Sequence, residues 1–211
     1  MNKIYLLSNR EYDDVENIEV FKIEFLPSNI DLSCYDFLLI TSKNAIYSLD
    51  SFNNDWKKIP SFTIAKKTAK VVIERGGKVE FIGKTGHGND FAEEILPLLK
   101  NKKVLYIRAL KVASNLVGIL KKHHIDIDEL ITYKTVCNEF LNKKIEDNSI
   151  VIFTSPSSVN CFFKKYSWNG TLKAVVIGKT TAKNMPLNIK YDVSSQTSIE
   201  ECIKVAKSLT L

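Results

Sequence analysis

Two short sequence segments recur at one common spacing, and this repeat constrains the fold more than any other feature. The chain reads ITS at residues 40–42 and FTS at 153–155, and IAKKTAK at 64–70 returns as IGKTTAK at 177–183. Both pairs share one offset, since 154 − 41 = 113 and 177 − 64 = 113. Because this period is the size of a domain, it predicts two similar domains with a cleft between them.

Apolar runs followed by polar segments predict strands that alternate with helices. Continuous runs at 37–40, 104–107 and 150–153 are typical of strands buried in a parallel sheet. Alternation of strand and helix favours an α/β fold, here two similar three-layer domains with parallel sheets. Ser42 is the expected N-cap of the helix that follows the strand at 37–40. Further strands are expected at 4–7, 19–26, 62–65, 79–82, 126–136, 174–177 and 189–193, and helices at 67–74, 90–98, 113–122, 157–165 and 198–208.

The second copy lacks its first strand, and the N-terminus offers a replacement. KIYLLSNR at 3–10 is similar to KVLYIRAL at 103–110. We therefore expect one discontinuous domain and one continuous domain, joined by two linkers that pair as a two-stranded β linker. The boundaries are 1–20 plus 139–211 for the discontinuous domain, 28–131 for the other, and 21–27 and 132–138 for the linkers.

Composition narrows the class of partner. The net charge of +6 is carried mainly by scattered lysines, which argues against a nucleic-acid partner and suits an anionic small molecule. The alternative is that these lysines are only solvated surface residues. No apolar run is long enough to span a membrane. The N-terminal MNKIYLLSNREYDD lacks the features of a secretory signal, so we expect a cytoplasmic protein.

Cofactor and metal motifs are missing from the sequence. The four cysteines form no CxxC pair, and we expect all of them to be buried free thiols. His87, His123 and His124 have no ligand spacing to a cysteine, so no metal site is assigned. IGKTTAK resembles the end of a P-loop, but Lys173 stands where that motif requires glycine.

Short polar segments follow several predicted strands, most of them just before a helix. Ligands of open parallel sheets bind at the carboxyl ends of strands, and helix N-termini attract carboxylates and phosphates. These residues otherwise serve only as helix caps. The segments are Ser8–Arg10, Thr41–Asn44, Ala65–Lys67, Arg108, Thr154–Ser158 and Gly178–Thr181.

In this order and spacing, the motifs resemble those of the uroporphyrinogen-III synthase family over nearly the whole chain. The resemblance rests on IVIFTSPSSVNCFF at 150–163, VVIGKTTA at 175–182, TSIEECI at 197–203 and TYKTV at 132–136. It implies two α/β domains joined by a β-ladder and a cofactor-independent, cyclising hydro-lyase. The implied substrate is hydroxymethylbilane, a linear tetrapyrrole with eight carboxylates, which loses water and closes through a spiro intermediate to uroporphyrinogen III with ring D inverted.

The resemblance also implies roles for particular residues. Tyr133 would be the general acid that protonates the departing hydroxyl, since a phenol with a pKa of about 10 is protonated at neutral pH. Without the resemblance, Tyr133 would be interpreted as packing between the linkers. Arg10, Lys66, Arg108 and Lys179 would contribute positive charge. The other implied substrate contacts are Thr41, Ser42, Thr154, Ser155, Ser157, Ser158, Gly178, Thr180 and Thr181.

The chain departs from the family pattern in three places. The segment from Arg10 to Phe21 is too short for the usual first helix, Glu11 replaces a frequent proline, and Ala65 replaces a usual glycine. Two other functions stay open: a non-catalytic two-lobed binding protein for an anionic small molecule, and a regulatory module. We expect a monomer, with a transient contact to the preceding pathway enzyme as an open alternative.

Overall fold

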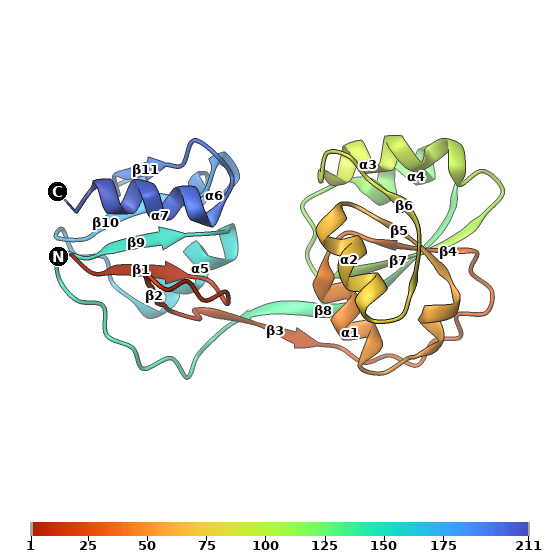
Figure 1. Ribbon diagram of the computed structural model, residues 1–211, viewed down its shortest axis with the longest axis horizontal. Helices are drawn as coiled ribbons and strands as arrows, with labels where there is room; N and C mark the ends of the chain where they lie inside the picture. Colours follow the sequence, from red (N-terminus) through yellow and green to blue (C-terminus); the bar gives the residue numbers. More distant parts are fainter. Residues whose placement is uncertain (1, 211) are drawn as a thin grey trace. The chain divides into compact units, whose positions relative to one another are not determined.

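The computed structural model describes residues 2–210, which form two compact units. The central unit runs from Ile23 to Lys134, and the discontinuous unit combines the chain up to Lys22 with the chain from Thr135. Each contains a β-sheet with helices packed against it (Figure 1). Among residues 2–210, no helix has the length and apolar character needed to cross a membrane.

The central unit is built on a six-stranded sheet of order β3-β8-β7-β4-β5-β6. Strands β8, β7, β4, β5 and β6 pair in parallel, as the alternation of strand and helix predicts. The strands are β3 (Phe21–Phe25), β4 (Phe37–Ile40), β5 (Pro60–Thr63), β6 (Lys78–Ile82), β7 (Lys103–Ala109) and β8 (Asp126–Cys137). The helices are α1 (Lys43–Asp50), η1 (Asp55–Lys58), α2 (Lys66–Glu74), α3 (Gly88–Ile95), η2 (Leu96–Leu98) and α4 (Leu116–Lys122).

Each face of this sheet carries its own apolar core. One core joins Ile40 and Leu105 of the sheet to buried residues of α1 and α2, such as Leu49. The other joins Leu39 and Tyr106 to buried residues of α3 and α4. Alternating strand residues therefore serve opposite faces, and the predicted three-layer α/β architecture is confirmed.

The discontinuous unit has a five-stranded sheet of order β11-β10-β9-β1-β2, all of it parallel. Apolar cores again lie on both faces, one against α5 and one against α7. The strands are β1 (Ile4–Leu7), β2 (Glu16–Asn17), β9 (Ile150–Phe153), β10 (Lys173–Val176) and β11 (Tyr191–Val193). The helices are α5 (Pro156–Lys165), α6 (Lys179–Ala182) and α7 (Ile199–Ser208).

The two sheets repeat one strand order. When the two sheets are aligned, the order β2-β1-β9-β10-β11 corresponds to β8-β7-β4-β5-β6. Strand β9 is then equivalent to β4 and β10 to β5, in agreement with the sequence offset. Strand β1 then takes the place of β7, and it pairs in parallel with β9 from Ile4 with Ile150 to Leu7 with Phe153. The prediction that the N-terminal strand completes the second copy is confirmed.

The two segments that connect the units carry backbone hydrogen bonds to each other. In the central unit, the Leu26 amide donates to the Thr132 carbonyl at 2.7 Å. In the discontinuous unit, the Asn138 amide donates to the Val20 carbonyl at 2.9 Å. Residue numbers rise on one segment as they fall on the other, which is the antiparallel arrangement.

The prediction that every cysteine is a buried free thiol is wrong. Cys137 and Cys161 form a disulfide with a Cα–Cα distance of 5.1 Å, Cys34 is an exposed free thiol, and only Cys202 is both free and buried. The disulfide escapes sequence patterns because its cysteines lie 24 residues apart, at the end of β8 and in α5. Only the folded path of the chain brings them together.

Helix α3 begins earlier than predicted. Asp90 lies in its first turn rather than at its cap, and His87 is the N-cap residue. Gly88, the first residue of α3, lies close to Ser114, since an added Cβ there would lie 2.4 Å from the Ser114 hydroxyl oxygen. A larger residue at this position would require the Ser114 side chain to shift.

Candidate functional site

Two predicted site residues, Thr41 and Ser42, follow strand β4 at the carboxyl edge of the central sheet. Ser42 is the N-cap of α1, and its hydroxyl accepts a hydrogen bond from the Asn44 amide at 3.2 Å, as predicted. The Thr41 hydroxyl lies 2.9 Å from the hydroxyl of Tyr106, a residue of β7. This edge therefore combines a helix N-terminus with a cluster of hydroxyl groups.

Tyr133 joins this cluster from strand β8. Tyr133 is 7% exposed and packs in the core that includes Ile40 and Ile107. Burial raises the pKa of the Tyr133 phenol, and a hydrogen bond with the Ser42 hydroxyl acts in the opposite direction. At neutral pH this group is a protonated donor placed at the carboxyl edge of the sheet.

Arg108 lies near the end of β7, and a carboxylate of the neighbouring strand β8 partly balances its charge. Its Nε atom is 3.2 Å from the Glu129 Oε2 atom, and its side chain is 15% exposed. The contact has the distance of an ion pair but not the direction of a hydrogen bond. Arg108 is thus a fixed cation whose charge is partly balanced before any ligand arrives.

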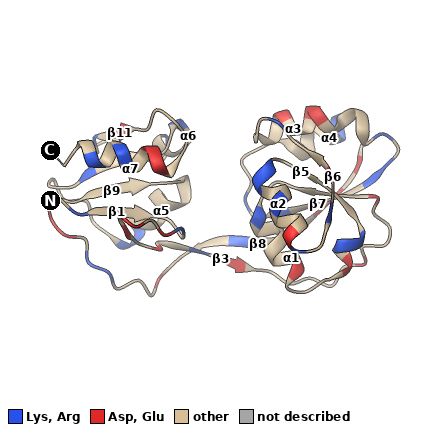
Figure 2. Cartoon of the chain, viewed as in Figure 1, with Lys and Arg blue, Asp and Glu red and all other residues tan. Residues whose placement is uncertain are grey.

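Helix α2 starts at Lys66, directly after Ala65, and presents lysines at its first turn. Lys66 and Lys67 are exposed, and Figure 2 shows basic residues on this helix. Its N-cap is Ala65, which makes no side-chain cap and has an ordinary extended backbone with φ of −163°. Ala65 therefore fits its place without backbone strain, although the family pattern has glycine there.

The discontinuous unit places Thr154 and Ser155 between β9 and α5, and Ser157 and Ser158 in the first turn of α5. Ser155 caps the helix, and Ser155 and Ser158 form a reciprocal capping box with two contacts of 3.1 Å. The Thr154 hydroxyl donates to the Leu7 carbonyl at 2.6 Å.

The hydrogen-bonding capacity of the buried Ser158 hydroxyl is used within this loop. It accepts from the Thr154 and Ser155 amides and donates to the Ser155 carbonyl at 2.7 Å. A serine hydroxyl has one proton to donate, so Ser158 keeps none for a ligand. The half-buried Ser157 lies in the first turn of the helix.

The neighbouring strand β10 leads into the short helix α6. Gly178 is its N-cap, with the extended backbone of φ 168°, and its carbonyl accepts from the Thr181 amide at 3.1 Å. Lys179 and Thr180 are exposed, whereas Thr181 is buried. Lys179 and Thr180 are therefore the residues of this turn that present side chains to solvent.

Arg10 follows β1, the strand that borders β9 on the side opposite β10. It is exposed, its amide donates to the Ser8 hydroxyl at 3.1 Å, and its carbonyl accepts from the Asn17 side chain. Asn17 occupies the place that Glu129 has in the repeat, because Leu6 pairs with Asn17 as Tyr106 pairs with Glu129. The discontinuous unit thus shapes this turn with an amide rather than an ion pair.

Two residues of the central site were not found from the sequence. Tyr106 lies within an apolar strand and gives no polar signal, and Glu129 was interpreted only as part of a strand. Knowledge of the strand order would have revealed both, because β7 lies between β4 and β8.

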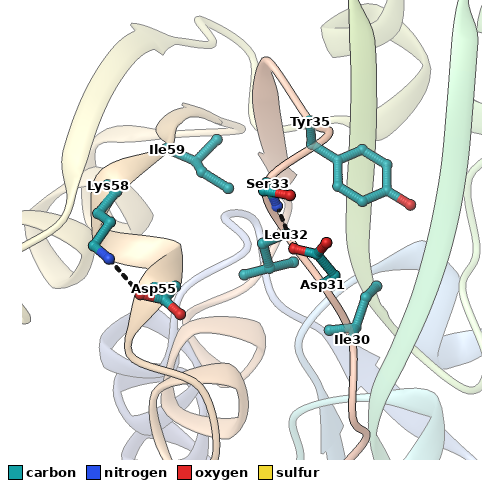
Figure 3. Close-up of a pocket in the computed structure, with 8 residues that line it drawn as sticks. All are labelled: Ile30, Asp31, Leu32, Ser33, Tyr35, Asp55, Lys58 and Ile59. Atoms are coloured by element: carbon teal, nitrogen blue, oxygen red, sulfur yellow. Dashed lines mark hydrogen bonds and ion pairs between the residues drawn. The ribbon is translucent and has the colours of Figure 1, made fainter.

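Among residues 2–210, no group of three or more His, Cys, Asp or Glu side chains could hold a metal ion. A pocket of about 410 Å³ lies at the opposite, amino edge of the central sheet, lined by residues that precede β4 and β5 (Figure 3). Its charged groups are already engaged, since Lys58 pairs with Asp55 at 2.6 Å and Asp31 accepts from the Ser33 amide at 2.9 Å.

Comparisons with known proteins agree with this description. The family model of uroporphyrinogen-III synthase HemD matches residues 18–204. The crystal structure of uroporphyrinogen-III synthetase from Helicobacter pylori is 28% identical, with a TM-score of 0.87, and the match covers 99% of this chain and 100% of that one. A mutant uroporphyrinogen III synthase from Thermus thermophilus is 14% identical with a TM-score of 0.58, covering 100% and 99%, which shows likeness of fold. A search of curated proteins finds no match.

Proposed function

The chain belongs to the uroporphyrinogen-III synthase family, and we propose that Tyr133 is the general acid with which it works. The reaction is the cyclisation of hydroxymethylbilane to uroporphyrinogen III in tetrapyrrole biosynthesis, with loss of water. The observation that carries the proposal is the buried Tyr133 phenol, held protonated beside the Ser42 hydroxyl at the carboxyl edge of the sheet.

The first step needs a proton at the departing hydroxyl of the bilane. Tyr133 donates it, the carbon–oxygen bond breaks, and water leaves a cation stabilised by the adjacent pyrrole. Ring D attacks this cation through its substituted carbon, giving the spiro intermediate. The bond from that carbon to the methylene bridge of ring C then breaks, and the bridge re-forms to the free α-carbon of ring D, which inverts the ring. Restoring the aromatic pyrrole releases a proton, which returns to the phenolate, so the cycle needs no external acid.

The substrate carboxylates are bound by helix N-termini and by the cations near them. Free amides at the starts of α1, α2, α5 and α6 carry partial positive charge. Exposed Lys66, Lys179 and Arg10 add full charges, and Ser157 and Thr180 add hydroxyl donors. Most of the barrier is lowered by holding the reacting chain end close to ring D, since the cation is intrinsically reactive.

Three other implied contacts act indirectly in this proposal. Ser158 and Thr154 shape the loop, because their hydroxyl protons are donated to backbone carbonyls. Thr181 is buried and supports the α6 turn. The amides of Thr154, Ser155 and Ser158 already donate to serine hydroxyls, so carboxylates at this turn are instead met by the Ser157 amide and by the hydroxyls of Ser155 and Ser157.

We further propose that the protein acts in the cytoplasm as a monomer, because one chain supplies all the groups named above. Any contact with the preceding pathway enzyme is transient. The domain boundaries at 21–27 and 132–138 are supported by the division into units after Lys22 and Lys134.

The isomer assay tests the function directly. The purified protein is supplied with hydroxymethylbilane, the products are oxidised, and the I and III isomers are separated chromatographically. We expect mainly isomer III, and isomer I alone from protein unfolded by heat. If native protein binds the bilane in calorimetry yet gives only isomer I, it is a binding protein and the assignment is wrong.

A further inference from the structure

The Cys137–Cys161 disulfide lies at a pocket in the surface of the discontinuous unit. We propose that this pair is a reversible thiol–disulfide exchange site for small acidic thiols. The pocket has a volume of about 470 Å³ and is lined by both cysteines together with Lys164 and Lys165. Neither cysteine belongs to the groups that bind or protonate the bilane.

The two cysteine residues differ in exposure. Cys161 is in α5, is 6% exposed and packs in the core with Phe162, whereas Cys137 is half-buried at the end of β8. Cys137 is therefore the half that an incoming thiolate reaches first. A disulfide shielded on all sides would instead exchange only after unfolding.

Two lysines and one carboxylate, that of Glu139, line the pocket beside the pair, so the charged residues of the lining sum to +1. Lys164 and Lys165 lie three and four residues after Cys161, so they share its side of the helix. Cations next to a thiol favour the thiolate, the form that attacks and leaves in exchange. They also attract thiols that carry carboxylates, which defines the class of reductant.

The exchange balances as two substitutions at sulfur. The thiolate of the small thiol attacks the Cys137 sulfur, the protein disulfide breaks, and Cys161 leaves as a thiolate next to the lysines. A second small thiol attacks the mixed disulfide and releases Cys137 as a thiolate. The protein gains two electrons and two protons, and two small thiols become one small disulfide.

Reduction removes the covalent link between α5 and the segment after β8, while Asn138 keeps its hydrogen bonds to the Val20 and Glu19 carbonyls. The segment at 137–139 is fastened to α5 by the disulfide and by a hydrogen bond from Lys165 Nζ to the Glu139 carbonyl at 3.3 Å. With the disulfide open, that single exposed hydrogen bond remains between Glu139 and the helix. The segment follows Lys134 closely, where the chain passes from one unit to the other.

The test counts thiols in folded protein. Oxidised protein is incubated without denaturant in reduced glutathione, quenched with acid, unfolded and alkylated with N-ethylmaleimide, and then weighed by mass spectrometry. We expect the number of labelled cysteines to rise from two to four, since the chain has four cysteines and two are free. Dialysis against oxidised glutathione should restore two.

The lysines supply the second readout. The double variant Lys164→Gln, Lys165→Gln should react more slowly with both thiols, because the leaving thiolate loses its neighbouring cations. The slowing should be roughly threefold greater with glutathione than with the neutral thiol 2-mercaptoethanol, because only glutathione also loses an electrostatic attraction. Lys183→Gln, which removes an exposed lysine at the end of α6, is the matched control. The proposal would be overturned if glutathione raised the number of labelled cysteines only when denaturant was present during the incubation. Equal slowing of the double variant with both thiols would also overturn it.

Discussion

The hydroxyl of Thr41 lies 2.9 Å from that of Tyr106, whereas the equivalent Thr154 donates instead to the Leu7 carbonyl. The repeat explains the difference, because Leu6 stands in the discontinuous unit where the central unit has Tyr106. One threonine of the repeat therefore meets a phenol and the other meets the backbone. The difference agrees with the proposal that places the acid, Tyr133, in the central unit.

Replacing the proposed acid tests that chemistry. Tyr133→Phe should lower turnover by roughly 10²-fold, because it removes the proton donor while keeping the ring that packs in the core. The substrate KM should change little, since the carboxylates are bound elsewhere. Steady-state formation of isomer III measures both quantities, and circular dichroism checks the fold.

Tyr35→Phe is the matched control for this change. Tyr35 is a tyrosine of the same unit whose hydroxyl bonds to Asp128 at 2.9 Å at the opposite edge of the sheet. Its loss should leave turnover unchanged. Equal turnover in the Tyr133→Phe variant would show that departure of the bilane hydroxyl needs no phenol.

The buried tyrosines predict a loss of stability at alkaline pH. Burial raises the pKa of Tyr106, although its hydrogen bond with Thr41 opposes the change, and burial likewise raises the pKa of Tyr133. A folded-state pKa above the unfolded value means that the folded protein holds more protons. The free energy of unfolding therefore falls as pH rises from about 10, by up to about 1.4 kcal/mol per pH unit for each group.

Tyr106→Phe isolates one part of this dependence. The variant cannot titrate at position 106, so its free energy of unfolding should fall less steeply with pH than that of the wild type. Urea unfolding between pH 8 and pH 11 measures the two slopes. Parallel slopes would mean that Tyr106 ionises as readily in the folded protein as in the unfolded chain.

Sequence reasoning succeeded where a local pattern has one structural solution. The repeat predicted that the N-terminal strand completes the second sheet, the apolar run at 37–40 predicted β4, and Ser42 is the N-cap it was expected to be. It failed where the contact depends on the folded path. The Cys137–Cys161 disulfide and the Tyr106 hydroxyl both join segments that carry no mutual signal in the sequence.

The capping box of α5 predicts a combined effect on stability and binding. Ser155→Ala removes the acceptor for the Ser158 amide, which should lower the free energy of unfolding by about 1 kcal/mol. It also disturbs the loop that presents amides to the substrate, so KM for hydroxymethylbilane should rise. Thermal unfolding and steady-state kinetics measure the two effects.

Ser198→Ala separates the two effects. Ser198 caps α7 in the same way, accepting from the Glu201 amide at 3.2 Å. Its replacement should cause a similar loss of stability with KM unchanged. A KM increase of the same size in both variants would show that the effect of Ser155→Ala reflects stability alone.

The disulfide predicts a large stability difference between oxidised and reduced protein. It closes a loop of 24 residues, and restricting the unfolded chain in this way contributes about 3 kcal/mol. Cys137→Ser should therefore match the unfolding midpoint of reduced wild type and should lose its response to reductant. Cys34→Ser, which replaces an exposed free thiol, should keep both the wild-type midpoint and the response. If Cys137→Ser still responded to reductant as strongly as wild type does, another sulfur pairing would have to account for the stabilisation.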